Sequence, residues 1–170
     1  MNWDALAAIA ELIGALGVIV TLVYLASQIR HGTLVTKASM AHSIAAAGRD
    51  WNKPIQSDPE LAWIWQTGTE DPTQLSERQR SQFSHLAFTF FRTFEDMHYQ
   101  HLQGTLADEL WHGWGLLFGT YAKAPGLQAW WGARRPVFSP PFQRYIEELD
   151  PVPVARVDDI VRTLGEGADA

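Results

Sequence analysis

Cysteine is absent from the 170-residue chain, which excludes a disulfide framework, a thiolate metal site and a thiol nucleophile. Basic residues are scarce: 13 Lys and Arg stand against 19 Asp and Glu, and none form a basic run. A net charge of -6 argues against a nucleic-acid partner, because phosphate binding needs clustered cations. The sequence also lacks a Gly-rich phosphate loop and a nucleophile elbow, so no catalytic residue can be named and the cofactor is left open.

Alternating strand patterns and internal repeats are absent too, whereas apolar residues recur at helical spacing throughout. A hydrophobic content of 46% and an aromatic content of 12% are enough for a folded core. The sequence therefore predicts an all-α protein. The expected architecture is an N-terminal transmembrane helix that continues into a stalk, followed by an irregular cytoplasmic helical bundle built on a long antiparallel helix hairpin.

The N-terminal segment 5–29 is a nearly unbroken apolar run in which Glu11 is the only charged residue. Its length suffices to cross the hydrocarbon core of a bilayer. A cleavable signal peptide would begin with basic residues, but this chain begins Met-Asn-Trp-Asp. The alternative, a buried helix of a soluble protein, requires a polar face that this run lacks.

The charges around this segment predict its orientation. No Lys or Arg precedes it, whereas Arg30, Lys37, Arg49 and Lys53 follow it. Because basic residues stay on the cytoplasmic side, we expect an inner-membrane protein with its N-terminus outside and its C-terminal domain in the cytoplasm.

Small and polar residues form a stripe along this segment at 100° per residue. We refer to this set as the small-residue stripe; it comprises Ala7, Ala10, Glu11, Gly14, Gly17, Val18, Thr21, Leu25 and Gln28. Small residues let helices approach closely in lipid, so the stripe predicts a homo-oligomer interface. Glu11 either lines a path between subunits or lies at the outer headgroup level beside Asp4.

The remaining sequence predicts three regions: 1–50 as transmembrane helix and stalk, 51–164 as cytoplasmic helical bundle and 165–170 as frayed tail. We expect the first helix to break at Trp51–Pro54, because proline disfavours helix at the preceding residue. Asp58 and Pro59 should open a short helix that reaches about Trp65, with Gly68 as its stop.

Four further helices follow in the prediction. Ser76 and Gln79 form a capping box that opens a long helix, which Gly104 ends near Gln103. Thr105 should cap its hairpin partner. Helices beginning at Pro125 and at Ser139–Pro140, the second reaching about Leu149, complete the bundle, and residues 156–164 could add an amphipathic turn.

Several of these segments resemble an uncharacterised bacterial family of single-span membrane proteins with a helical cytoplasmic domain. The similarity rests on a span ending Leu-Ala-x-Gln-Ile-Arg at Leu25–Arg30 and on short motifs across the remaining chain. The motifs are Asp58–Ala62, Phe94–Asp96, Tyr99–Gln100, Gly104–Leu106, Trp111, Pro125–Gly126, Trp130–Trp131 and Arg134. The resemblance implies the same architecture and no particular activity.

Histidines provide the candidate metal ligands. Glu95 with His98, and Glu109 with His112, have the spacing of di-iron motifs, but the helical wheel turns His112 away from the core and leaves Glu95 on the flank. His98 and His101 face the core of the long helix and could bind a metal with a carboxylate from a neighbouring helix. The alternative is a pair of hydrogen-bonded core histidines.

A charged cluster occupies another face of the same helix, where Arg92, Glu95, Asp96 and Tyr99 recur at three- and four-residue steps. We expect a solvated or interhelical ion pair. If the cluster is buried, it could instead join the long helix to the C-terminal elements through Arg134 or Arg135.

Tryptophan is abundant, with 8 residues in the chain. Core filling explains most of them, although an aromatic pocket or a membrane-facing surface is an alternative. Trp63 and Trp65 cannot both point inward from one helix, and neither can Trp130 and Trp131, so one of each pair should be partly exposed.

These observations lead to three functional hypotheses. The first is a non-enzymatic membrane-anchored interaction or assembly protein that self-associates through its span and recruits a cytoplasmic protein partner through exposed tryptophans. The second is a metal- or small-molecule-binding sensory domain centred on His98 and His101. The third is a small homo-oligomeric membrane pore lined by Glu11, Thr21 and Gln28.

Overall fold

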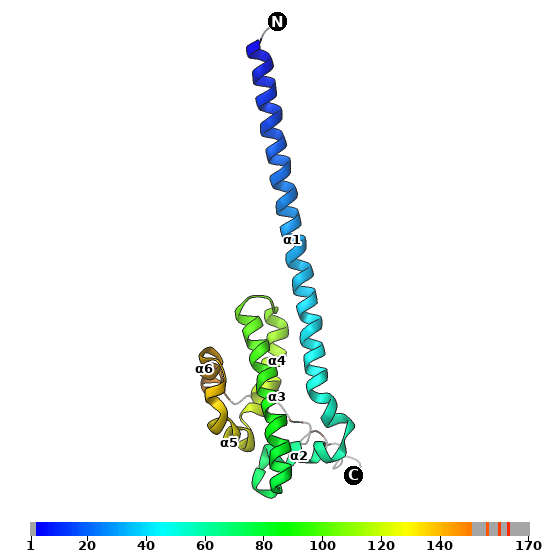
Figure 1. Ribbon diagram of the computed structural model, residues 1–170, viewed down its shortest axis with the longest axis vertical. Coiled ribbons are helices and arrows are strands. Elements are labelled where there is room, and N and C mark those ends of the chain that lie inside the picture. The colour runs from blue at the N-terminus through cyan, green and yellow to red at the C-terminus, as the bar shows by residue number, and fades with distance from the viewer. Residues whose placement is uncertain (1–2, 151–155, 157–159, 161–162, 164–170) are drawn as a thin grey trace. The chain divides into compact units, whose positions relative to one another are not determined.

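The described part of the protein consists of helices and the short turns that connect them. The computed structural model describes residues 3–150, 156, 160 and 163, with the side chains of 3–10, 12, 13, 15 and 34 left aside. No strand occurs in these residues, so the predicted all-α class is confirmed. The helices shown in Figure 1 are α1 (Trp3–Ser57), α2 (Pro59–Glu70), α3 (Glu77–Leu102), α4 (Asp108–Ala122), α5 (Pro125–Arg134) and α6 (Pro140–Glu148). Short 3₁₀ turns lie at Pro72–Gln74 and Arg135–Val137.

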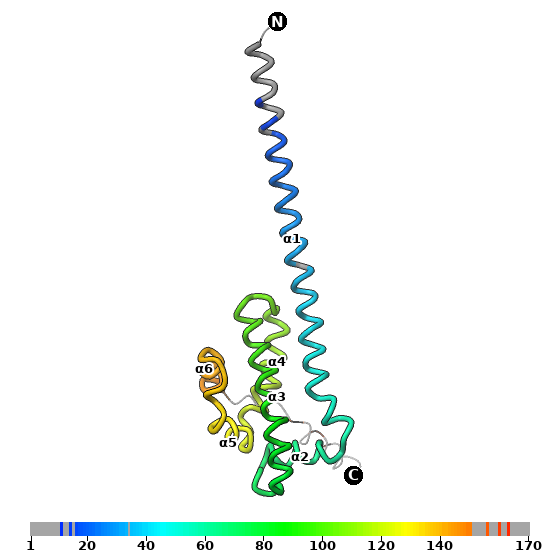
Figure 2. Tube along the Cα trace, viewed as in Figure 1, coloured from blue at the N-terminus to red at the C-terminus, as the bar shows by residue number. Residues whose placement is uncertain are grey.

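The chain divides into two compact units, Met1–Ser39 and Met40–Ala170. The first unit contains only the N-terminal part of α1, which Figure 2 traces as a helix. The apolar side chains described in this unit are exposed, including Leu22 at 59% and Ile29 at 70%. By length and composition, the helix from Leu16 onward is apolar enough to cross a membrane.

The second unit begins within the predicted stalk. Ile44 is buried in the core of this unit, and Met40 packs against that core. Gly48 is also buried: a Cβ atom placed there would lie 2.5 Å from the Trp114 ring. Residues 40–50 therefore pack as part of the second unit.

The predicted break of the first helix at Trp51–Pro54 is wrong, because α1 continues through Pro54 to Ser57. Trp51 and Ile55 pack against the core from this last stretch. Ser57 Oγ donates a hydrogen bond to the Lys53 carbonyl at 2.7 Å, which satisfies one acceptor of the last turn. Tertiary packing thus outweighs the cost of proline inside the helix.

The predicted start of α2 is confirmed. The Asp58 carboxylate accepts hydrogen bonds from the Glu60 and Leu61 amides, and Pro59 occupies the first helical position. Gly68 does not stop this helix, which reaches Glu70. Gly68 is instead a packing residue, since a Cβ atom there would lie 2.4 Å from the Phe83 ring.

The long helix α3 forms the centre of the domain. Its predicted capping box is present, with Ser76 and Gln79 bonded to each other's backbone. Gly104 follows its C-terminus with φ +67°, a left-handed conformation that suits glycine. The helix packs against α2, α4, α5 and α6.

The predicted cap of α4 at Thr105 is wrong. Ala107 occupies the N-cap position and forms no side-chain cap. The Thr105 hydroxyl instead donates to the Gln100 backbone carbonyl at 2.9 Å and also bonds the Gln100 side chain. The hydroxyl therefore closes the turn after α3, and the hairpin of α3 and α4 is seen in Figure 1.

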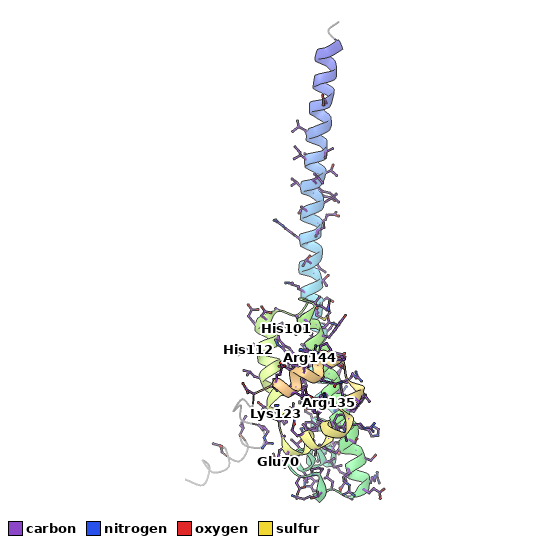
Figure 3. The ribbon with its side chains drawn as sticks, turned by 90° about the vertical axis from the view of Figure 1, so that its left-hand side faces the viewer. Glu70, His101, His112, Lys123, Arg135 and Arg144 are labelled. Carbon is purple, nitrogen blue, oxygen red and sulfur yellow. The ribbon has the colours of Figure 1, made fainter. Side chains whose placement is uncertain are left out.

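The predicted starts of α5 and α6 are confirmed, with Pro125 and Pro140 at their first helical positions. Lys123, which is labelled in Figure 3 and directly follows α4, donates to the Ile146 carbonyl of α6 at 2.9 Å. The amphipathic turn expected at 156–164 lies mostly outside the described residues, and the tail expected at 165–170 lies wholly outside them.

Aromatic side chains dominate the core. The buried aromatic residues are Trp65, Phe83, Phe90, Phe91, Phe94, Phe118, Trp131, Phe138 and Phe142. Ring contacts connect them, such as the stacked pair Phe94 and Phe118 with centroids 4.9 Å apart. These rings supply the apolar area that holds the short helices around α3.

Candidate functional site: a tryptophan groove

A large open cavity of about 1080 Å³ lies in the second unit, between the end of α1 and helices α2, α3 and α4. We call it the tryptophan groove. Its lining residues are Gly48–Lys53, Ile55, Gln56, Ala62, Trp65, Gln66, Thr69, Phe90, Trp114, Leu117, Phe118 and Tyr121. Typical ligand pockets have volumes of roughly 300–1,000 Å³, so the groove could hold a sizeable small molecule.

The groove owes its shape to aromatic packing around Trp51. The Trp51 ring meets Trp65 edge-on at a centroid distance of 5.2 Å and Phe90 at 5.4 Å. Trp65 and Phe90 are buried, whereas Trp51 and Trp114 are partly exposed. Buried rings thus form the floor, and the partly exposed indoles present apolar faces to whatever occupies the groove.

Glycine at position 48 contributes to this shape. Because a Cβ atom there would overlap the Trp114 ring, a larger residue would require the indole to shift away from the α1 backbone. The groove therefore depends on a close approach of α4 to the last turns of α1.

Two buried polar atoms of the groove lack a hydrogen-bond partner in the described structure: Trp51 Nε1 and Thr69 Oγ1. Thr69 is only 3% exposed. Buried donors and acceptors are nearly always paired in folded proteins, because an unpaired one loses its water contacts without replacement. Both atoms are also closed to solvent, so they lie behind the surface that a ligand in the groove would touch.

Charged side chains lie on one side of the groove. Arg49, Asp50 and Lys53 are all exposed lining residues from α1. No ion pair to these three is formed within the described residues. The groove therefore has an apolar floor and a rim with one net positive charge, in a chain whose total charge is -6.

This groove was not predicted from the sequence. Arg49 was expected in a stalk, Trp51 and Lys53 at a helix break, and Thr69 lies just beyond the expected helix stop at Gly68. The available signal was the alternation of basic and aromatic residues at Arg49, Trp51 and Lys53, but only the continuation of α1 through Pro54 gives them a common helix.

His98 and His101 lie in aromatic surroundings. His98 is 7% exposed and stacks on Tyr145 at a centroid distance of 4.6 Å, while His101 stacks on Trp111 at 4.9 Å. His101 Nδ1 lies 3.6 Å from the Asp108 carboxylate, within ion-pair range but too far for a hydrogen bond. Burial lowers the pKa of His98, and a positive charge on His101 lowers it further, against the opposing effect of Glu95.

The proposed metal role of His98 and His101 gains no support from this arrangement. Within the described part of the chain, no group of three His, Cys, Asp or Glu residues could hold a metal ion. Glu109 and His112 are exposed on α4, and Figure 3 labels His101 and His112 at separate places. The two imidazoles serve as aromatic packing partners, and metal binding by them stays an untested prediction.

The charged cluster on α3 is partly buried. The Glu95 carboxylate accepts hydrogen bonds from the Ser139 amide at 2.6 Å and from the Arg92 guanidinium. Arg92 also donates to the Val137 carbonyl at 3.2 Å. The cluster thus joins α3 to the segment before α6, which the sequence analysis considered only as an alternative to a solvated pair.

The residues that make this connection differ from those expected. Backbone groups of Val137 and Ser139 replace Arg134 and Arg135, and Arg135 instead pairs with Glu147 of α6 at 2.9 Å. The expected position of Glu95 on the flank is wrong, since the residue is 7% exposed. Asp96 and Tyr99 are exposed on the same helix.

The paired tryptophans behave as predicted. Trp65 and Trp131 are buried, whereas Trp63 is 46% exposed and Trp130 is intermediate. Trp130 Nε1 donates to the Ser84 hydroxyl at 2.9 Å, so its polar edge is satisfied.

The small-residue stripe lies on the first unit. Its described members Glu11, Gly14, Gly17, Val18, Thr21, Leu25 and Gln28 are exposed on α1, and the side chains of Ala7 and Ala10 lie outside those described. A Cβ atom at Gly14 or Gly17 would meet no atom within 4 Å. The stripe is therefore an open helix face within this unit.

Comparison with known proteins adds no identification. No family model, no curated protein and no solved structure matches the chain. The resemblance to a bacterial single-span family accordingly stays a prediction, and function has to be argued from the geometry described above.

Proposed function

We propose that the protein is a membrane-anchored interaction protein: α1 crosses a bilayer, self-associates there, and carries a helical domain that binds its target in the tryptophan groove. The main support is the continuous apolar surface of α1 between Leu16 and Ile29, all of it exposed within its unit. Exposed apolar surface of this extent marks an interaction with lipid or protein. A hydrocarbon environment removes this surface from water without requiring any change in the helix.

The proposed location is the bacterial inner membrane, with the N-terminus outside and the domain after Met40 in the cytoplasm. This orientation follows from Arg30 and Lys37, which come after the apolar segment while no basic residue precedes it.

Self-association is the second part of the proposal. Gly14 and Gly17 leave open space on the stripe, so the backbone of another copy could approach closely there. The hydroxyl of Thr21 is already bonded to the Gly17 carbonyl, and Gln28 is bonded to the Tyr24 hydroxyl. Because these polar groups have partners within α1, the stripe suits close packing between helices better than the lining of a pore.

Light scattering of the detergent-solubilised full-length protein tests self-association. We expect a defined oligomer that Gly14→Leu converts to a monomer, because the added side chain prevents close approach. Ala26→Leu, a similar enlargement off the stripe at 100° per residue, serves as the matched control and should leave the oligomer intact. A monomeric wild type, or equal behaviour of both variants, would contradict the proposed interface.

A small-molecule-binding role for the helical domain is the second candidate. The observation that favours it is the tryptophan groove, an open cavity of about 1080 Å³ with an apolar floor. It differs from the original small-molecule hypothesis, which placed the site at His98 and His101.

A further inference from the structure

We infer that the tryptophan groove binds a small amphipathic acid, with an aromatic or acyl body against the indoles and a carboxylate directed toward Arg49 and Lys53. The inference rests on the proposed function of the groove as the binding site of the domain. It adds the chemical class of the ligand.

The apolar body follows from the floor of the groove. Trp65, Phe90 and Phe118 are buried there, and the partly exposed faces of Trp51 and Trp114 stand beside them. A flat ring or an acyl chain would remove these faces from water without leaving polar groups of its own unpaired. A fully polar ligand would find few partners on this surface.

The net positive charge of the groove rim favours a ligand with a negatively charged group. Arg49 and Lys53 stand one helical turn apart on α1, and both line the groove with no ion pair among the described residues. Asp50 offsets one of these charges and leaves the lining with one net positive charge. This sign disfavours a cationic ligand, although aromatic walls alone would also suit one.

A matched pair of probes tests the inference on the full-length protein in phosphatidylcholine nanodiscs. Naphthalene-1-acetate carries an aromatic body and a carboxylate, and naphthalene-1-acetamide differs from it in having no charge. Calorimetric titration against protein-loaded and empty nanodiscs separates binding to the protein from partition into lipid. We expect saturable binding of the acid and about tenfold weaker binding of the amide.

Variants assign this binding to the groove. Arg49→Gln combined with Lys53→Gln should abolish the preference for the acid, whereas Arg78→Gln, at an exposed cation outside the lining, should not change it. Circular dichroism establishes that each variant is folded.

The possible results are distinguishable. Absence of saturable binding by either probe would overturn the groove as a binding site, and the inference with it. Equal binding of acid and amide, unaffected by the Arg49 and Lys53 variants, would overturn the acidic ligand alone and leave the proposed binding role standing.

Discussion

Glu95 shows how one side chain can connect distant parts of the chain. Its carboxylate holds the Ser139 amide ahead of α6 and the Arg92 guanidinium on α3. The Arg92 guanidinium in turn lies 4.8 Å from the centre of the Phe138 ring. The buried carboxylate therefore organises the packing of the C-terminal elements on α3.

Replacement of the Glu95 carboxylate should destabilise the folded domain. We expect Glu95→Gln to lower the free energy of unfolding by about 2 kcal/mol, because charge-assisted hydrogen bonds are lost in a buried site. Asp96→Asn is the matched control: it removes a carboxylate from the next, exposed position of the helix and should change stability little. Urea denaturation followed by tryptophan fluorescence measures both, and equal effects would refute this role of Glu95.

His98 should make the stability of the domain depend on pH. Its pKa is lowered from 6.5, mainly by burial, so the unfolded chain binds its proton more readily than the folded chain. Stability is then fully present above about pH 6.5 and decreases as the pH falls below it, by at most about 1.4 kcal/mol per unit for this single group.

The measurement is the unfolding midpoint between pH 8 and pH 5. His98→Gln should flatten its pH dependence over this interval, whereas His112→Gln, at an exposed histidine, should leave the slope as in the wild type. An unchanged slope in His98→Gln would show that another group titrates.

At the scale of the helices, paired glycines determine how closely α2 and α5 pack. A Cβ atom at Gly126 would lie 1.9 Å from the Gly68 carbonyl oxygen, which is a backbone atom and cannot rotate away. At Gly68 the absence of a side chain leaves space for the Phe83 ring of α3 to pack against the α2 backbone. The contact of three helices therefore requires that no side chain stand between their backbones.

Gly126→Ala should consequently destabilise the domain by about 3 kcal/mol, because α5 must move away from α2. Gly132→Ala is the matched control on the same helix, where a Cβ atom would meet nothing within 4 Å. It should be neutral or stabilising by up to about 1 kcal/mol through helix propensity. Thermal unfolding of both variants decides the point, and similar losses would contradict a backbone clash.

Local chemistry predicted the helix starts well and the helix ends less well. Asp58, the Ser76 capping box, Pro125 and Pro140 act within one turn of the chain, so the sequence contains their whole mechanism. Pro54 and Gly68 were read as breaks because proline and glycine disfavour helix locally, and packing against distant residues reversed both outcomes.

At the scale of the whole molecule, the apolar segment of α1 was predictable because run length and composition are properties of the sequence alone. The tryptophan groove was not predictable in this way. Its lining comes from α1, α2, α3 and α4, and their meeting depends on close contacts such as that of Gly48 with Trp114. Periodicity assigns residues to faces of a helix but does not state which helices meet.

Membrane anchoring is the central claim at this scale, and the absence of cysteine makes it directly testable. A single cysteine at Asn2→Cys or at the exposed position Ser81→Cys would be the only thiol of the chain. The measurement is labelling of each variant by a membrane-impermeant maleimide in intact bacterial spheroplasts and in lysed ones. The proposal predicts that position 2 reacts in both and position 81 only after lysis; reaction of both positions from outside, or recovery of the protein in the soluble fraction, would contradict it.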